Sequence, residues 1–211
     1  MIEFYTWFTP NGRKVAILLE ELGIEYNTHS VNIGKDEQFD PEFLKISPNN
    51  KIPAILDTDN NYPLFETGAI LLYLAEKHGK FLNTKDRDAY WRTMEWLMWQ
   101  MGGFGPNLGQ VHHFTKYNPG KSDYAQERYE TEARRLYRVL NERLEGREFI
   151  VDDYSIADMA CWPWAARHNW QEIDLNDYPN VRRWYMTMLD RPAVQAAWNI
   201  PENDQPLPIP E

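Results

Sequence analysis

Cysteine is nearly absent from this sequence, which contains only Cys161 among its 211 residues. One cysteine cannot form a disulfide within the chain, and the lack of disulfides is typical of proteins in a reducing compartment. The chain also begins with the strand-like stretch MIEFYTW, which has neither a basic segment nor an apolar signal core. We therefore expect a cytoplasmic protein.

Basic residues and long apolar runs are scarce as well. The chain has 22 Lys and Arg residues against 32 Asp and Glu, a net charge of −10 and a pI near 5.0. This charge gives no general attraction to phosphate backbones or anionic lipids. No stretch approaches the roughly 18 apolar residues of a membrane span. We therefore expect no nucleic acid and no membrane partner. The 43% of hydrophobic residues is enough for one large core or two small ones.

The sequence pattern changes near residue 80. Before that point short strand-like stretches alternate with helices, whereas the later sequence is helical almost throughout. The clearest helix is 10–22, because apolar residues recur at i, i+3, i+4 and i+7 from Val15 to Leu22, Pro10 suits the first turn and Gly23 suits the end. The expected strands are 2–6, 25–33, one that begins at Pro53, and 62–65; the other expected helical runs are 67–78, 86–116, 123–145, 155–170 and 178–190.

This order predicts a small α/β domain of the type βαβ-ββα, followed by an all-helical domain. The predicted boundaries are 1–79 for the first domain, 80–86 for a linker and 87–200 for the helical domain. The last residues, 201–211, are rich in proline, and we expect them to run along the surface in extended form.

The stretch ISPNNKIPAIL, residues 46–56, places a proline at the start of an apolar strand. Pro53 cannot donate a ladder hydrogen bond, so it suits a strand start, and the Ile52–Pro53 bond can be trans or cis. A cis bond would turn the N–H and C=O of Ile52 outward, toward a peptide-like ligand that adds as a strand. A trans proline that simply begins the strand is the alternative.

Glu66 and Thr67 precede the helix at 67–78. A carboxylate and a hydroxyl at this place are ordinary capping residues. Together with the N–H groups of the helix start, they could also bind a ligand that carries both an α-carboxylate and an α-ammonium group. Both interpretations remain open at this point.

Four motifs in this order resemble the cytosolic glutathione transferase superfamily, and in particular its bacterial Nu class of disulfide-bond oxidoreductase type. They are TPNG at 9–12, SPNNKIPAI at 47–55, GGFGPNLGQ at 102–110 and YSIADMACWPW at 154–164. The resemblance covers about residues 1–200. It implies a thioredoxin-like N-terminal domain, an all-helical C-terminal domain, and glutathione as a co-substrate without a prosthetic group.

The resemblance also implies which residues hold glutathione. Glu66 and Thr67 would bind the γ-glutamyl end, the backbone of Ile52 would pair with the cysteinyl part, and Pro53 would be cis. Lys51 and Gln38 would reach the glycine carboxylate. Arg128, from the helical domain, would contact the bound glutathione or a second one. Many relatives have serine in place of Thr67, which keeps the hydroxyl.

Thr9 and Asn11 are the expected sulfur site. A free thiol has a pKa of roughly 8.5, and a helix N-terminus with hydroxyl and amide donors can lower it. Thr9 can at the same time be the N-cap of the first helix, because a hydroxyl both donates and accepts. Tyr5 lies inside the first strand and is ranked below Thr9. Cys161 lies in an apolar helix and is expected to be a buried, inert thiol.

The reaction implied by the resemblance is attack of glutathione thiolate on a small disulfide or other electrophile, with GSSG as the product of disulfide reduction. Transfer of glutathione to electrophiles and reduction of organic hydroperoxides would be weaker activities of the same site. The alternative is a non-catalytic protein of the same fold, used for ligand binding or stress regulation. The intact set from Thr9 to Thr67 favours the enzyme.

Other features carry weaker expectations. The run at 90–101 is apolar on more than one helix face, which predicts a homodimer. The alternative is a central helix surrounded by its own chain. His112 and His113 lack partners at metal-ligand spacing, so we expect no metal site and place them at the second-substrate cleft or in solvent. GGFGP looks like a bend in a long helix, and Ser155 with Asp158 predicts a capping box.

Overall fold

The computed structural model describes residues 1–210, which divide into two compact units. The first consists of Met1–Leu82 and Arg191–Leu207, and the second of Asn83–Asp190 with the described chain after Leu207. The division after Leu82 falls inside the expected linker. The segment 191–207 groups with the N-terminal unit, although the sequence placed most of it in the helical domain. Its helix α9, Pro192–Trp198, packs on α1, Pro10–Leu22, and was not expected from the sequence.

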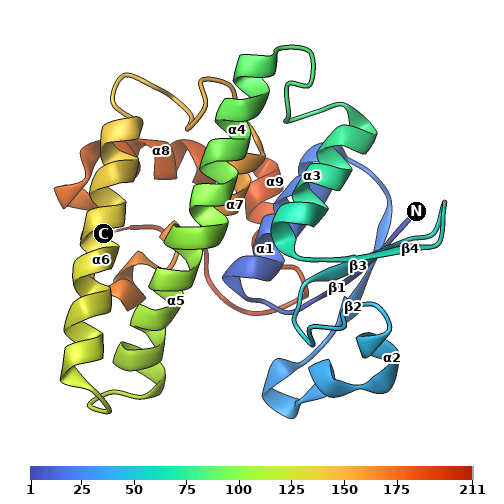
Figure 1. Cartoon of the computed structure of the whole chain (residues 1–211), viewed down its shortest axis with the longest axis horizontal. Coiled ribbons are helices and arrows are strands. Elements are labelled where there is room, and N and C mark those ends of the chain that lie inside the picture. Colours follow the sequence, from blue (N-terminus) through green and yellow to red (C-terminus); the bar gives the residue numbers. More distant parts are fainter. Residues whose placement is uncertain (211) are drawn as a thin grey trace. The chain divides into compact units, whose positions relative to one another are not determined.

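The N-terminal unit is built on a four-stranded mixed sheet with the order β2-β1-β3-β4 (Figure 1). β1 pairs in parallel with β2, whereas β3 is antiparallel to both β1 and β4. This is the expected βαβ-ββα arrangement, and with the helical second unit it confirms the predicted fold class. The strands are β1 Ile2–Thr6, β2 Tyr26–Ser30, β3 Ala54–Asp57 and β4 Tyr62–Phe65.

Two strands are shorter than the sequence suggested. The N–H of Val31 makes the last hydrogen bond to β1, to the carbonyl of Thr6 at 2.9 Å, and β2 ends at Ser30 because the chain then enters the 3-10 turn Ile33–Lys35. β3 begins at Ala54, one residue after Pro53. The Ile52–Pro53 bond is cis, as the family resemblance implied.

Helices cover the sheet of this unit. α1 and α3, Thr67–His78, pack against each other, and the buried side chains of Ile2 and Phe4 belong to this part of the core. α1 begins with Thr9 as N-cap and Pro10 in the first turn, and it ends at Gly23 in the left-handed conformation, as predicted. A second cluster of Val31, Phe43 and Ala54 joins the short helix α2, Pro41–Leu44, to the sheet.

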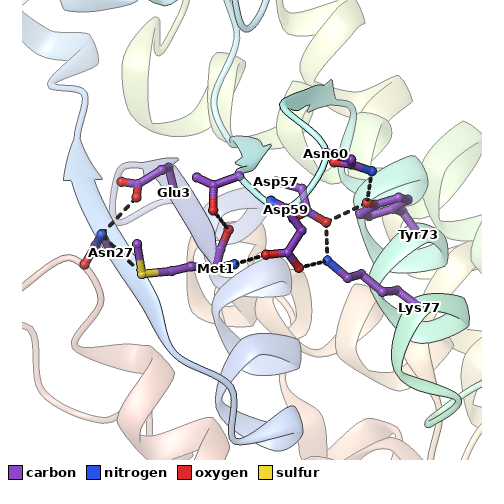
Figure 2. A network of polar contacts seen from close by, with 9 residues as sticks. Met1, Glu3, Asn27, Asp57, Asp59, Asn60, Tyr73 and Lys77 are labelled. Carbon is purple, nitrogen blue, oxygen red and sulfur yellow. Dashed lines mark hydrogen bonds and ion pairs between the residues drawn. The ribbon is translucent and has the colours of Figure 1, made fainter.

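A polar network fixes α3 against the end of β3 (Figure 2). The fully buried carboxylate of Asp57 accepts hydrogen bonds from Tyr73 at 2.6 Å and from Lys77 at 2.5 Å. Burial would raise the pKa of Asp57, but the hydrogen bonds from Lys77 and Tyr73 outweigh it and hold this pKa below its ordinary value. Lys77 also contacts Asp59 at 2.7 Å. The network therefore fixes the direction in which α3 leaves the sheet.

The second unit is a bundle of helices, and α7 is buried along its whole length. Its expected first helix at 86–116 is interrupted by two π-helical segments, of which Gln100–Phe104 coincides with the bend predicted at GGFGP. A Cβ on Gly105 would lie 2.6 Å from Nε2 of Gln100 and 3.2 Å from Nε1 of Trp164, so a larger residue would require these side chains to shift where this helix approaches α7. The elements are α4 Arg87–Trp99, α5 Gly105–His112, the π-helical His113–Tyr117, α6 Asp123–Arg143, α7 Ile156–Ala165 and α8 Pro179–Leu189.

The predicted capping box at the start of α7 is present. Asp158 is fully buried and accepts from the N–H groups of Ile150 and Ser155 at 3.0 and 3.1 Å, and from the indole of Trp184 at 2.9 Å. Burial raises the pKa of Asp158 to about 6, against the effect of these donors. This carboxylate therefore joins the start of α7 to α8.

The expectation for His112 was wrong. Its side chain is buried, and its ring lies 5.7 Å from that of Trp164 and 5.4 Å from that of Trp170. The amide Nε2 of Gln171 lies 3.2 Å from Nε2 of His112 and can only donate, so this ring nitrogen accepts and the imidazole is neutral. Burial first, and then the charge of Arg167, lower the pKa of His112 to about 4. His113 is exposed.

The Pro-rich tail packs more closely than expected. The indole of Trp198 donates to the carbonyl of Pro206 at 2.8 Å, and Asn203 donates to the carbonyls of Trp198 and Pro201. These hydrogen bonds connect the tail to α9. The proline content of the tail did not predict them. Across residues 1–210, no helix has the length and apolar character needed to cross a membrane.

Candidate functional site

The sheet register brings the predicted site loops to one edge. Tyr5 on β1 lies opposite Ala54 on β3, and Ala54 lies opposite Phe65 on β4. β1 runs from this row toward Thr9, β3 starts here directly after Pro53, and β4 ends here directly before Glu66. The loops with the residues predicted for the sulfur, the cysteinyl part and the γ-glutamyl end therefore leave the sheet at neighbouring positions of the same edge.

The start of α1 is a tightly built helix N-terminus. The Thr9 hydroxyl accepts from the N–H of Gly12 at 3.1 Å, and the Thr9 carbonyl accepts from the N–H of Arg13 at 3.1 Å. A Cβ on Gly12 would lie 2.3 Å from the carbonyl oxygen of Trp7, so only glycine fits there. Thr9 and Asn11 are half-buried in this first turn. Because the Thr9 oxygen accepts from the backbone, its hydrogen is the part of the hydroxyl that can donate to an anion.

The loop before β3 presents the backbone of Ile52. Ser47 is fully buried and donates from its hydroxyl to the carbonyl of Lys51 at 2.8 Å, and Asn50 adopts a left-handed conformation with φ 47°. This turn fixes Lys51 and Ile52 before the ladder begins at Ala54. In the described chain no backbone hydrogen bond is found for Ile52, whose N–H and C=O are the groups that would pair with a peptide-like ligand.

The start of α3 carries the residues predicted for the γ-glutamyl end. Glu66 is exposed and has φ 71°, a left-handed conformation that costs a non-glycine residue about 1–3 kcal/mol. Its side chain makes no capping hydrogen bond to the helix. The capping interpretation is therefore weaker for Glu66 than the ligand-binding one. Thr67 is buried, and Lys14 from α1 reaches its hydroxyl, with 3.5 Å between Nζ and Oγ1.

Gln38 and Lys51 are the residues predicted for the glycine carboxylate. Gln38 lies in the 3-10 turn Glu37–Phe39, where Nε2 donates to Asp36 at 3.4 Å and Oε1 is buried without a hydrogen-bond partner among residues 1–210. Lys51 is exposed. Gln38 comes after the end of β2 and Lys51 comes before the start of β3, at the edge described above, and their contact with a ligand remains a prediction.

Arg128 belongs to the other unit. It is exposed on α6 and lines a cavity of about 710 Å³ within the helical unit. The walls of this cavity also carry Asn107 from α5 and the aromatic rings of Tyr124 and Tyr129. The cavity is also lined by Glu127 and Glu132, so its charge is mixed, and the role of Arg128 in binding glutathione stays a prediction.

The two rival sulfur residues have other surroundings. Tyr5 stacks on His29 with 4.6 Å between ring centroids, and burial raises the pKa of its phenol. Cys161 is fully buried in α7 of the helical unit. A raised phenol pKa and a fully buried thiol do not favour either group for the sulfur chemistry, and the ranking of Thr9 and Asn11 above both stays a prediction.

Lys14 was not singled out from the sequence. It stands directly before the apolar positions of α1, where a lysine is ordinarily an exposed flank residue. Its burial depends on how α3 packs on α1, and the helical pattern of one segment contains no information on that packing. Within residues 1–210, no group of three or more His, Cys, Asp or Glu side chains is placed to hold a metal ion.

Comparison with known proteins identifies relatives over nearly the whole chain. Residues 1–76 match the family described as glutathione S-transferase, N-terminal domain, and residues 104–192 match the corresponding C-terminal domain. The disulfide-bond oxidoreductase YfcG of Escherichia coli is 52% identical over 205 residues, which cover 93% of this chain and 94% of the relative.

Solved structures agree with this similarity. A glutathione transferase from Pseudomonas putida, with one glutathione disulfide bound per subunit, is 43% identical, with a TM-score of 0.89 and coverage of 95% of this chain and 91% of that one. A glutathione transferase from Burkholderia graminis, with two glutathione molecules per subunit, is 40% identical, with a TM-score of 0.89 and coverage of 96% and 89%.

Proposed function

This chain belongs to the glutathione S-transferase family, and from that premise we propose that it is a glutathione-dependent disulfide reductase. The observation that carries the proposal is the register of the sheet, which pairs Tyr5 with Ala54 and Ala54 with Phe65. This register brings the three predicted glutathione loops to one edge of the sheet. The name of the 52% identical relative supports the choice of disulfides as substrates.

The reaction uses two thiol–disulfide exchanges. The thiolate of bound glutathione attacks one sulfur of a small disulfide, a new S–S bond forms, and the other half leaves as a thiolate that takes up a proton. A second glutathione thiolate then attacks the glutathione sulfur of the mixed disulfide. The products are GSSG and two small thiols, and the two electrons come from the two glutathiones. Conjugation to electrophiles and hydroperoxide reduction would use the same thiolate as weaker activities.

The start of α1 supplies what this chemistry needs. Lowering a thiol pKa by one unit requires about 1.4 kcal/mol of preferential stabilisation of the thiolate. A helix N-terminus contributes typically 0.3–1 kcal/mol, and hydrogen bonds to an anion contribute about 1.5–3 kcal/mol. The Thr9 hydroxyl and the Asn11 amide are the proposed donors. The γ-glutamyl end would lie at Glu66 and Thr67, with its cysteinyl backbone paired to Ile52.

No cysteine of the protein takes part in this proposal. The single cysteine, Cys161, is fully buried in the helical unit, where a thiol cannot be reached by a small disulfide. Both sulfur nucleophiles must therefore come from glutathione. The two solved relatives hold either one glutathione disulfide or two glutathiones per subunit, which supports room for two tripeptides.

We also propose that the chain acts as a cytoplasmic homodimer. On α4, Trp91 is 57% exposed and Met98 is 47% exposed, and their seven-residue spacing places them on one helix face. Two large apolar side chains on one face favour a second subunit as their cover. A reducing compartment would keep glutathione available as the thiol.

The test is a coupled assay of glutathione-dependent reduction of a small dialkyl disulfide, with GSSG formation as the readout, run beside conjugation to an aryl halide. We expect disulfide turnover well above conjugation, and full turnover in Cys161→Ala. Loss of turnover in a folded Cys161→Ala variant would contradict the thiol-free mechanism. Absence of both activities in protein that binds glutathione would favour the non-catalytic alternative.

A further inference from the structure

Two consecutive residues of α1 are buried cations. Arg13 and Lys14 are each only 1% exposed, and both belong to the first turns of the helix that carries Thr9. Lysine and arginine are almost never fully buried unless partners compensate them. An apolar residue would fill either position at a lower desolvation cost. The partners of the two side chains therefore indicate what each contributes.

Arg13 is directed to the C-terminal segment of its own unit. Its guanidinium lies 3.4 Å from the ring centroid of Trp198, and Nη2 donates to Gln205 at 2.9 Å. The same nitrogen lies 3.4 Å from the carbonyl of Trp198. These contacts connect α1 to α9 and to the tail. The role of Arg13 is thus explained by packing and stability.

Lys14 is directed to the site instead. Its Nζ lies 3.5 Å from Oγ1 of Thr67, across the contact between α1 and α3. An ammonium group has donors only, so in this contact the hydroxyl of Thr67 is the acceptor. Any hydrogen bond that the hydroxyl makes through its own hydrogen then goes to an acceptor, such as a carboxylate. The hydroxyl in this orientation suits the acidic group of a ligand and not its ammonium group.

We propose that Lys14 is a positioning residue that makes the site at Thr67 selective for the α-carboxylate of the γ-glutamyl group. This inference rests on the proposed function, because it takes glutathione as the ligand. Lys14 does not need to touch the ligand. It holds the hydroxyl of Thr67 as a donor, and its buried charge lies behind that hydroxyl, where little water screens its attraction for a carboxylate.

The experiment compares two ligands by isothermal calorimetry. One is glutathione, and the other is 4-aminobutyryl-Cys-Gly, which lacks only the α-carboxylate. In the wild type we expect glutathione to bind more tightly. In Lys14→Met we expect the Kd of glutathione to rise roughly tenfold, as for the loss of a hydrogen bond supported by a charge, while the Kd of the analogue changes less than about twofold. Lys14→Arg should recover part of the selectivity.

Arg13→Met is the matched control, because it removes the neighbouring buried cation, whose guanidinium contacts Trp198 and Gln205. It should lower the melting temperature and leave the ratio of the two Kd values unchanged. If Lys14→Met does not fold, Thr67→Val removes the acceptor of the lysine and should lose the same selectivity, which Thr67→Ser should keep.

The outcomes separate this inference from the proposed function. If Lys14→Met raises the Kd of both ligands equally, or if Thr67→Val keeps the selectivity, the role of Lys14 is overturned. In both cases, binding of glutathione by the wild type would still support the proposed site. A wild type that binds both ligands equally would also overturn the role of Lys14. Failure of the wild type to bind glutathione at all would instead overturn the proposed function.

Discussion

The two units bury polar side chains with different consequences. In the N-terminal unit, Lys14 and Ser47 are buried against Thr67 and Lys51, at the loops that form the candidate site. In the helical unit, Asp158 and His112 are buried among donors, aromatic rings and an amide of the bundle itself. We expect Lys14 and Ser47 to position a ligand, whereas Asp158 and His112 specify the packing of helices, as Asp57 and Arg13 do in the N-terminal unit. Substitutions in the two units should therefore change different measured quantities.

Asp158→Ala should have the largest effect, and it should be an effect on stability. The change leaves the N–H groups of Ile150 and Ser155 and the indole N–H of Trp184 without their acceptor, and each buried donor left unpaired costs about 1–3 kcal/mol. We expect urea denaturation to show a loss of about 3–5 kcal/mol in the free energy of unfolding.

Asp158→Asn is the control for this prediction, because it keeps one carbonyl oxygen as an acceptor and should cost less. For the fraction that remains folded, the Kd of glutathione should stay at the wild-type value. A loss below about 1 kcal/mol for the alanine variant would show that Asp158 does not organise the bundle in this way.

His112→Gln should change how stability depends on pH. In the folded protein the pKa of His112 is about 4, below its ordinary value of 6.5. The unfolded chain therefore binds the proton more readily, and the free energy of unfolding decreases as pH falls from 6.5 to 4. The difference corresponds to about 3 kcal/mol. Asp158, raised from 3.8 to about 6, acts in the opposite direction, because the folded state binds its proton more readily and gains stability as pH falls from 6 to 4.

The two contributions therefore partly cancel in the wild type. Without His112, the free energy of unfolding should rise on acidification by about 3 kcal/mol relative to the wild type between pH 6.5 and 4. Urea denaturation at several pH values measures this difference. Parallel curves for the two proteins would mean that His112 is not buried as a neutral side chain.

Thr9→Ala should affect chemistry more than folding. Loss of the hydroxyl donor should raise the pKa of bound glutathione and reduce disulfide turnover at neutral pH roughly tenfold, which corresponds to one pKa unit. The N-cap is lost as well, at a cost of about 1 kcal/mol in stability. Steady-state rates from pH 6 to 9 measure the shift. Thr9→Ser should retain the wild-type profile, and an unchanged profile in the alanine variant would remove Thr9 from the sulfur site.

Gln205→Leu should have the smallest effect. It removes the hydrogen bond to Arg13 at 2.9 Å, but the stacking of Arg13 on Trp198 remains. We expect a loss of about 1 kcal/mol in the free energy of unfolding and an unchanged Kd for glutathione. If the free energy of glutathione binding changes by more than the free energy of unfolding, the tail also influences the site.

The sequence predicted the N-terminal unit well because its signals are local. Pro10 and Gly23 mark the ends of α1, and alternation marks β1, so these elements appear at the expected residues. The cis state of Pro53 was expected from the family resemblance, since an isolated X-Pro bond gives no such signal. The strand register that pairs Tyr5 with Ala54 and Ala54 with Phe65 depends on contacts between distant residues, and only the structure shows it.

The helical unit was predicted less completely, since its features depend on contacts between distant helices. His112 is buried because Trp164 and Trp170 surround it, and they lie more than fifty residues further along the chain. The helix α9 follows the helical unit in sequence but belongs to the N-terminal unit, where it packs on α1, and its seven residues carry no strong pattern of their own. The burial of Lys14 was missed for the same reason.

The central claim is that the sheet edge next to Thr9 holds glutathione with its sulfur ionised at the start of α1. The most direct measurement is the thiolate absorbance of bound glutathione near 240 nm, titrated against pH in the wild type and in Thr9→Ala. The account predicts a bound thiol with a pKa at least one unit below the free value of roughly 8.5, and a smaller decrease in the variant. A bound thiol that titrates at the free value, or no binding of glutathione, would contradict it.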